Sequence, residues 1–208
     1  MLLARFTDPL NFKALLLTVG CTLACLPLNA EPLSANGLNY SHVAIGHTTQ
    51  DVTNTQGQAN YTGYSFELSY LFNEHFYLLA GYDHTSTGSG SSEDHYRKNK
   101  MGLGYRQALS EGTDMLAVVS HSDALFTLFP GTTDFGLRLG LKSVSWVPGF
   151  ETTTAYHFSS AEMLGQRTWR HGLALGMKYK FTPNLYLGAD LNSITNLNRS
   201  FINVGMLF

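Results

Sequence analysis

The sequence has little cysteine and no large excess of charge, and each shortage excludes a class of function. Cys21 and Cys25 are the two cysteines among 208 residues, and both lie in the first 30. If that segment is removed, disulfides, thiolate metal sites and cysteine nucleophiles are all excluded. The formal net charge is −2, and no block of basic residues indicates a nucleic-acid partner.

Long apolar runs are also scarce. One run, from Ala14 to Leu28, follows two basic residues and ends just before Ala30, as in a secretory signal peptide. It is shorter than the roughly 20 apolar residues that a membrane-spanning helix needs. We therefore predict that residues 1–30 are a removed signal peptide and that residues 31–208 form one domain.

Motifs for cofactors and metals are absent as well. No glycine-rich phosphate loop occurs, and the eight histidines show no compact spacing such as His-Glu-x-x-His. The sequence thus predicts no cofactor and no metal site.

What the sequence does contain is alternation with a period of two residues, which is typical of β-strands with one apolar face. In residues 61–72 one face carries Tyr64, Phe66, Leu68 and Tyr70, and the other face is polar or small. The same pattern returns several times along the chain. The predicted strands are residues 38–47, 61–72, 76–85, 98–108, 115–126, 134–142, 150–158, 172–181, 185–192 and 201–208.

An apolar outside and a polar inside are the pattern of transmembrane β-barrels. We predict an all-β, up-and-down antiparallel transmembrane barrel of about ten strands. Eight strands are the alternative, if residues 38–47 or 115–126 are misassigned, and which face of these two segments points inward stays open. A soluble β-sandwich could carry similar faces, but the export signal and the apolar last strand favour an outer-membrane barrel.

The predicted connections alternate in length, as an up-and-down barrel with both ends in the periplasm requires. Aromatic residues gather near the short turns, where a girdle at the membrane interface is expected. The short turns are predicted at residues 73–75, 110–114, 147–149 and 182–184, and the longer polar loops at residues 48–60, 86–94, 159–167 and 195–200.

Three segments together resemble a known family: Gly63 to Tyr70, Tyr77 to Tyr82, and Gly102-Leu103-Gly104-Tyr105. They look like the small outer-membrane barrels that include OmpA-type and opacity-type surface proteins, over residues 37–208. The resemblance implies fold and location and carries no catalytic residue.

The last strand carries the expected assembly signal. Met206 and the terminal Phe208 would be recognised by the barrel-assembly machinery, although Asn203 stands where such strands often have Gly. Outer-membrane lipid is the other expected partner, and the protein is expected to be a monomer with an unidentified loop ligand.

The predicted inward faces carry both acids and bases. A narrow barrel is normally filled by side chains, so these charges are expected to pair into a network that plugs the lumen. The alternative is a narrow channel that favours anions, for which many inward glycines would leave room. The predicted network is Glu67, Asp83, Lys100, Arg106, Arg138, Lys142, Glu151, Lys178, Lys180 and Asp190.

Enzymatic activity has weak support in the sequence. His157 and Ser159 share a strand face, and lipid hydrolases of the outer membrane use a similar His-x-Ser pair. A second group, Ser120 to Asp123, has neighbours that point to opposite faces. We therefore predict a non-enzymatic barrel with a structural or surface-interaction role, and the lipid-modifying hydrolase stays a remote alternative.

Overall fold

The computed structural model describes residues 37–54, 57–88, 94–127 and 131–208, so the predicted signal peptide at residues 1–30 lies outside the described residues. Within these ranges no helix is long and apolar enough to cross a membrane. The described chain forms ten strands: β1 (His42–Asn54), β2 (Gly57–Leu71), β3 (Phe76–Ser86), β4 (His95–Ser110), β5 (Thr113–Phe126), β6 (Thr132–Val144), β7 (Phe150–Met163), β8 (Gln166–Lys180), β9 (Leu185–Ile194) and β10 (Leu197–Leu207).

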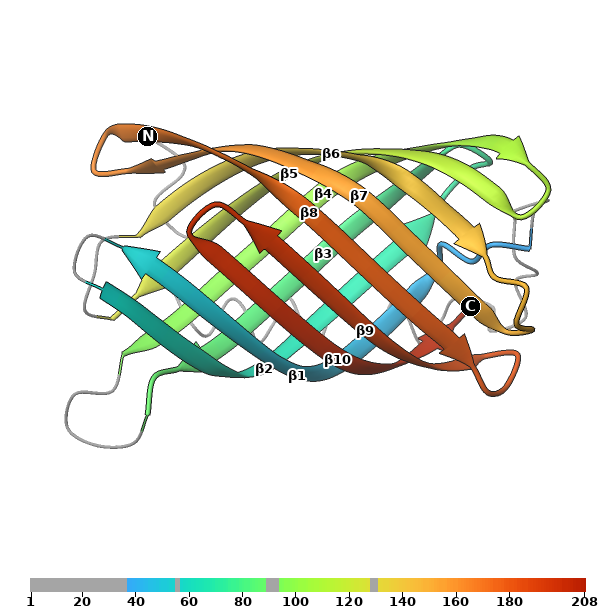
Figure 1. Ribbon diagram of the computed structural model, residues 1–208, viewed down its shortest axis with the longest axis horizontal. Coiled ribbons are helices and arrows are strands. Elements are labelled where there is room, and N and C mark those ends of the chain that lie inside the picture. Colours follow the sequence, from blue (N-terminus) through green and yellow to red (C-terminus); the bar gives the residue numbers. More distant parts are fainter. Residues whose placement is uncertain (1–36, 55–56, 89–93, 128–130) are drawn as a thin grey trace. The chain divides into compact units, whose positions relative to one another are not determined.

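The strands form one closed antiparallel barrel. Each strand pairs with its neighbours in sequence, and β1 pairs with β10, from His42 opposite Leu207 to Val52 opposite Leu197 (Figure 1). Closure leaves no sheet edge along these pairs, which is the condition for a β-structure to lie in lipid. The prediction of an up-and-down barrel of about ten strands is confirmed, and the eight-strand alternative is wrong.

The short turns lie at the same end of the barrel as the C-terminus. β2 ends at Leu71 and β3 begins at Phe76, close to the predicted turn, and the predicted turns at residues 147–149 and 182–184 also fall between strands. The predicted turn at residues 110–114 is too long, because β4 runs to Ser110 and β5 begins at Thr113. Gly112 and Gly149 have φ angles of 75° and 78° in these turns, a conformation that glycine adopts at low cost. We call this the short-turn end and the opposite end the loop end.

At the loop end, the predicted loop at residues 48–60 is wrong, because β1 continues to Asn54 and β2 begins at Gly57. The physical reason is that Thr48 and Gln50 are polar residues on the inward face, where they are 0% and 1% exposed. A polar stretch here belongs to a strand that faces a polar lumen, and it does not mark a loop.

The predicted loops at residues 159–167 and 195–200 are also too long. β7 runs to Met163 and β8 begins at Gln166, so the connection is Leu164-Gly165, with φ angles of 51° and 75°. β10 begins at Leu197 and leaves a two-residue turn after Ile194. The predicted loop at 86–94 agrees with the strand ends, since β3 ends at Ser86 and β4 begins at His95.

The structure also assigns the two undecided faces. In β1, Ala44 is buried and Ile45 is 57% exposed, and in β5, Leu116 is buried while Val119 is 62% exposed. Ala44 and Leu116 therefore face the lumen. Every strand thus alternates between the lumen and the outside.

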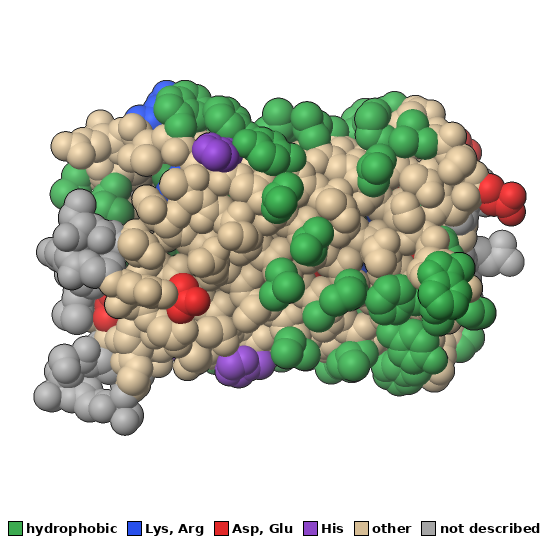
Figure 2. All heavy atoms as spheres, in the orientation of Figure 1, with side chains coloured by type: hydrophobic (Ala, Val, Ile, Leu, Met, Phe, Trp, Pro, Cys, Tyr) green, Lys and Arg blue, Asp and Glu red, His purple; other side chains and the backbone are tan. Residues whose placement is uncertain are grey.

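The outside of the barrel is apolar. Large exposed hydrophobic side chains occur on every strand, including Met101 (65%), Phe135 (61%) and Ile202 (62%). Figure 2 shows apolar side chains gathered toward the short-turn end, at the right, and charged side chains nearer the two ends. Contiguous apolar surface of this extent is not left in water by soluble monomers, so we assign it to lipid contact.

Aromatic rings line the outside near both ends. At the short-turn end, the Phe76 ring lies 6.3 Å from that of Phe72 and 5.3 Å from that of Tyr105, as the predicted girdle requires. Toward the loop end, Phe158 stacks on Trp169 at 5.1 Å. Two such girdles are typical of barrels that cross a bilayer.

Candidate functional site in the barrel lumen

The lumen near the short-turn end contains a buried ion-pair group. Glu151 from β7 is 3.2 Å from the Lys142 ammonium and 2.5 Å from that of Lys180. On the neighbouring strands β4 and β5, the Arg106 guanidinium lies 2.8 Å from Asp114, which is opposite Lys142 in the pairing of β5 with β6. Each of these charges faces inward because alternate residues of a strand share a face.

The residues that precede β1 enter the lumen and contact this ion-pair group. Leu38, Asn39 and Tyr40 are 0%, 9% and 4% exposed. The Lys142 ammonium donates to the Asn39 carbonyl oxygen, and the Asn39 backbone N–H donates to Glu151 at 3.4 Å. We call residues 38–40 the N-terminal plug segment.

Tyr40 is the anchor of the plug segment. Its hydroxyl donates to Asp114 at 2.7 Å, and its ring lies 4.2 Å from the Lys142 ammonium and 5.2 Å from the Arg106 guanidinium carbon. Burial and the hydrogen bond to Asp114 raise the pKa of Tyr40, so the phenol stays a donor. Cation–π contacts of this kind strengthen when water is excluded.

Apolar packing also holds the plug segment at the short-turn end. Leu38 and Tyr40 belong to a buried cluster that also contains residues of β2, β3 and β5. The prediction that residues 38–40 begin the first strand, 38–47, is wrong. β1 begins only at His42, because residues 38–40 turn into the lumen and make these contacts there. The other members of the cluster are Leu71, Tyr77, Leu116 and Val118.

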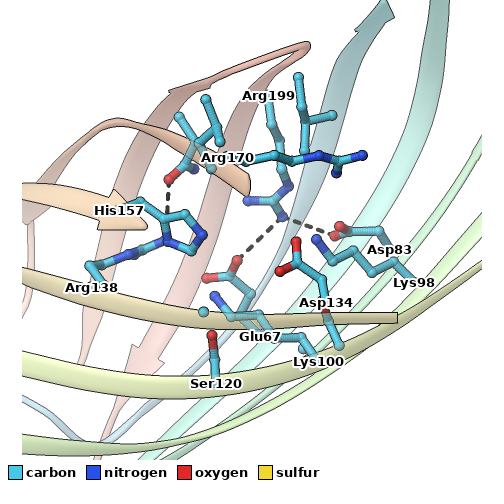
Figure 3. A pocket seen from close by; sticks show the side chains of 16 residues that line it. Glu67, Asp83, Lys98, Lys100, Ser120, Asp134, Arg138, His157, Arg170 and Arg199 are labelled. Atoms are coloured by element: carbon cyan, nitrogen blue, oxygen red, sulfur yellow. Dashed lines mark hydrogen bonds and ion pairs between the residues drawn. The ribbon is translucent and has the colours of Figure 1, made fainter. Parts of the chain in front are cut away.

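A second polar group lies in the middle of the lumen. Arg199 from β10 reaches Glu67 at 3.3 Å and Asp83 at 2.9 Å (Figure 3). The Ser65 hydroxyl donates to Asp83 at 2.5 Å. Asp190 accepts from the Asn203 amide at 3.3 Å. The sequence missed Arg199 because it fell in the predicted loop at residues 195–200.

All ten predicted network residues face the lumen, but only some of them form ion pairs. Six take part in ion pairs: Glu67, Asp83, Arg106, Lys142, Glu151 and Lys180. Within the described residues, Lys100, Arg138, Lys178 and Asp190 have no opposite charge within 4.0 Å. Arg138 donates to Asn192 at 3.2 Å, and Lys178 lies 3.2 Å from a His42 ring nitrogen.

A cavity of about 70 Å³ lies beside Arg199. Its charged lining comes from six strands, and Lys98, Asp134, Arg170 and Arg199 were not in the predicted network. Lys98 could have been found from the sequence, because it shares the face of Lys100. The charged lining residues are Glu67, Asp83, Lys98, Lys100, Asp134, Arg138, Arg170 and Arg199.

The loop end of the lumen holds an apolar cluster under a buried carboxylate. The rings of Tyr61, Tyr96 and Phe126 pack together, with Tyr96 and Phe126 4.9 Å apart. The Tyr61 hydroxyl donates to Asp94 at 2.7 Å, and Asp94 also accepts from the Thr127 backbone N–H. Part of the wall toward the loop end is thereby packed from within.

The candidate hydrolase residues do not form a nucleophile and base. His157 is buried next to Gly136 in the lumen, and the Ser159 hydroxyl is directed to Asp134 at 3.4 Å. In the second group, His121 and Asp123 contact each other at 3.1 Å on the outer face. In the described part of the chain, no three His, Cys, Asp or Glu side chains could hold a metal ion.

The predicted assembly residues lie on the outward face of the last strand. Ile202 and Val204 are 62% and 48% exposed, and Met206 continues the same face toward Phe208. The Phe208 backbone N–H donates to the Ser41 carbonyl at 3.2 Å. The C-terminal residue therefore also holds the chain entering β1.

No family model matches the chain, and no curated protein matches it either. Among solved structures, its fold is similar to the KdgM porin in complex with disordered oligogalacturonate, with 13% identity, a TM-score of 0.40, and coverage of 80% of this chain and 99% of that chain. For Ail, the attachment invasion locus protein of Yersinia pestis, the identity is 13%, the TM-score 0.36 and the coverage 81% and 97%.

A third match is an outer membrane channel from Pseudomonas putida F1, with 8% identity, a TM-score of 0.47, and coverage of 83% of this chain and 97% of that chain. The chain is thus similar in fold to outer-membrane β-barrels.

Proposed function

We propose that the protein is an integral outer-membrane β-barrel with a structural or surface-interaction role. The observation that carries this proposal is the apolar outer surface of a closed barrel in which most of the strand charges face inward. Inside lipid every backbone N–H and C=O must be paired within the protein, and a closed barrel meets that condition. Outer-membrane lipid is then its main partner.

We propose that the short turns and both mature termini face the periplasm. In such barrels the short connections are periplasmic and the longer ones extracellular. Thr87, Asp94, Thr127 and Gly131, which flank the β3–β4 and β5–β6 connections, would then lie on the outer side of the membrane. Met206 and Phe208 would be read by the barrel-assembly machinery, and the protein would act as a monomer.

A plugged lumen supports the structural role. In this proposal the plug segment closes the short-turn end, where Leu38 and Tyr40 are buried, and the cluster of Tyr61, Tyr96 and Phe126 narrows the loop end. Small barrels are normally filled by their own side chains. The charges between these clusters would then fix the barrel's shape.

The conductance of the refolded barrel, residues 31–208, tests this role. In planar bilayers we expect no steady single-channel steps from the unaltered barrel. The double variant Leu38→Ser, Tyr40→Ala should introduce steps, because it removes the apolar anchor and the hydroxyl bound to Asp114. A folded, unaltered barrel that conducts would contradict the plugged lumen.

An anion-leaning channel is the second candidate, and the unpaired cations of the central cavity favour it. In that case the unaltered barrel should show steady anion-selective steps. Neutralising Arg138 or Lys178 should then reduce the selectivity, since these bases have no carboxylate partner within 4.0 Å in the described chain.

We also propose that the barrel is not a lipid hydrolase. Cells that carry the His157→Ala variant should show the same lipid A composition as cells with the unaltered protein, because His157 faces the lumen and Ser159 is directed to Asp134. Mass spectrometry of extracted lipid A makes the comparison. A species lost only in the variant would assign a catalytic role to His157.

A further inference from the structure

The central cavity has an unbalanced charge. Five basic and three acidic side chains line it. Arg199 is bound to Glu67 and Asp83, which leaves Asp134 as the single acid among four bases of the described lining. None of the four lies within 4.0 Å of a carboxylate oxygen of the described chain; they are Lys98, Lys100, Arg138 and Arg170.

These bases surround a common space. They project from β4, β6 and β8, and Figure 3 shows them around the Arg199 side chain. The Arg170 Nε atom is buried and has no hydrogen-bond partner in the described structure. Buried donors without partners are costly, and a bound group that accepts hydrogen bonds and carries negative charge would remove that cost.

The size of the cavity limits the occupant. At about 70 Å³ it exceeds the space of a single water molecule, which needs only about 10–15 Å³ on the same measure. Guanidinium and ammonium groups bind phosphate and carboxylate oxygens through short, charge-assisted hydrogen bonds. The Ser120 and Ser122 side chains add hydroxyl donors to the same wall.

The paired part of the barrel wall is shortest beside this cavity, at β9 and β10. β8 begins at Gln166, but its pairing with β9 starts only at Gly172, opposite Ile194 (Figure 1). An open groove of about 500 Å³ surrounds the β9–β10 turn, and Ile194 and Leu197 line both the groove and the cavity. These two side chains separate the cavity from the outside over the shortest part of the wall.

We propose that the central cavity is a binding site for a small oxyanion of the phosphate or sulfate class, entered over the β9–β10 turn. Lys98, Lys100, Arg138 and Arg170 hold the anion, and Ile194 and Leu197 form the entrance. Binding needs space and charge but no continuous path through the barrel. The site is therefore independent of whether the lumen conducts.

Inorganic phosphate is the probe, and its ³¹P linewidth is measured against the full chain refolded in a phosphate-free detergent. We expect saturable binding of one phosphate per chain, with competition by sulfate. Lys100→Gln should weaken binding by about tenfold or more, the range for a lost charged hydrogen bond. Arg97→Gln is the matched control, because Arg97 lies on the same strand but faces outward.

The Asp134→Asn variant should change the affinity for phosphate in the opposite direction from Lys100→Gln. Removing the negative charge of Asp134, the one acid of the described lining without an ion pair, should tighten phosphate binding. A variant that merely failed to fold could not bind more tightly, so this result cannot be explained by misfolding. A heat-modifiability gel shows that each variant is folded. No saturable binding to the folded, unaltered barrel, or equal affinity in Lys100→Gln and Arg97→Gln, would overturn the proposal.

The entrance is tested by Ile194→Trp. A larger side chain over the β9–β10 turn should slow phosphate exchange and leave the charges in place. Unchanged exchange in a folded variant would overturn the assigned route.

Discussion

Replacing Glu151 by Gln is expected to be the most destabilising single change of charge in this barrel. Glu151 is 3% exposed and bridges Lys142 and Lys180. Loss of its charge leaves two lumen cations without their carboxylate, and breaking a buried pair in this way costs about 3–5 kcal/mol. Urea unfolding from lipid vesicles, followed by the fluorescence of Trp146 and Trp169, measures the change in the free energy of unfolding.

Glu162→Gln is the matched control for this change. Glu162 lies on the same strand, but its pair with Arg167 has side chains that are 49% and 63% exposed. Exposed pairs contribute about 0–1 kcal/mol. Adding Lys142→Met to Glu151→Gln should restore part of the lost stability. Equal unfolding curves for the Glu151 and Glu162 variants would contradict a stabilising role for the buried network.

Gly104→Val is expected to prevent a large fraction of the chains from folding. The Tyr77 ring occupies the place where a side chain on Gly104 would begin. Tyr77 is 4% exposed and packs in the cluster that contains the plug segment. Valine would expel the ring from that cluster, and displaced core aromatics cost about 3–5 kcal/mol. The folded fraction on an unheated detergent gel is the measurement.

Gly81→Ala serves as the control for that substitution. Gly81 also faces the lumen, but the nearest atom to a side chain placed there is 3.7 Å away, an ordinary contact. This variant should fold like the unaltered barrel. If Gly104→Val folded equally well, the close contact between Tyr77 and the backbone of β4 would not be required.

The alternation of single strands was enough to predict the barrel and most of its lumen charges. The inward orientation of Glu151 and Lys142, for example, was predicted from the alternation of apolar and polar residues along their strands. The N-terminal plug segment was wrongly predicted as the start of the first strand, because residues 38–40 enter the lumen through contacts with distant residues such as Asp114. Arg199 was missed because polar residues that face a polar lumen look like loop residues in the sequence.

The alternation of apolar outward and polar inward side chains also affects how the chain reaches its membrane. The mean hydropathy of the whole sequence is −0.06, and along the strands most outward apolar residues alternate with inward polar or small ones. An unpaired strand therefore has little preference for lipid over water. Affinity for the bilayer arises only when the strands pair and separate the two kinds of side chain, so the chain can cross an aqueous compartment before closure and cannot readily leave the membrane after it.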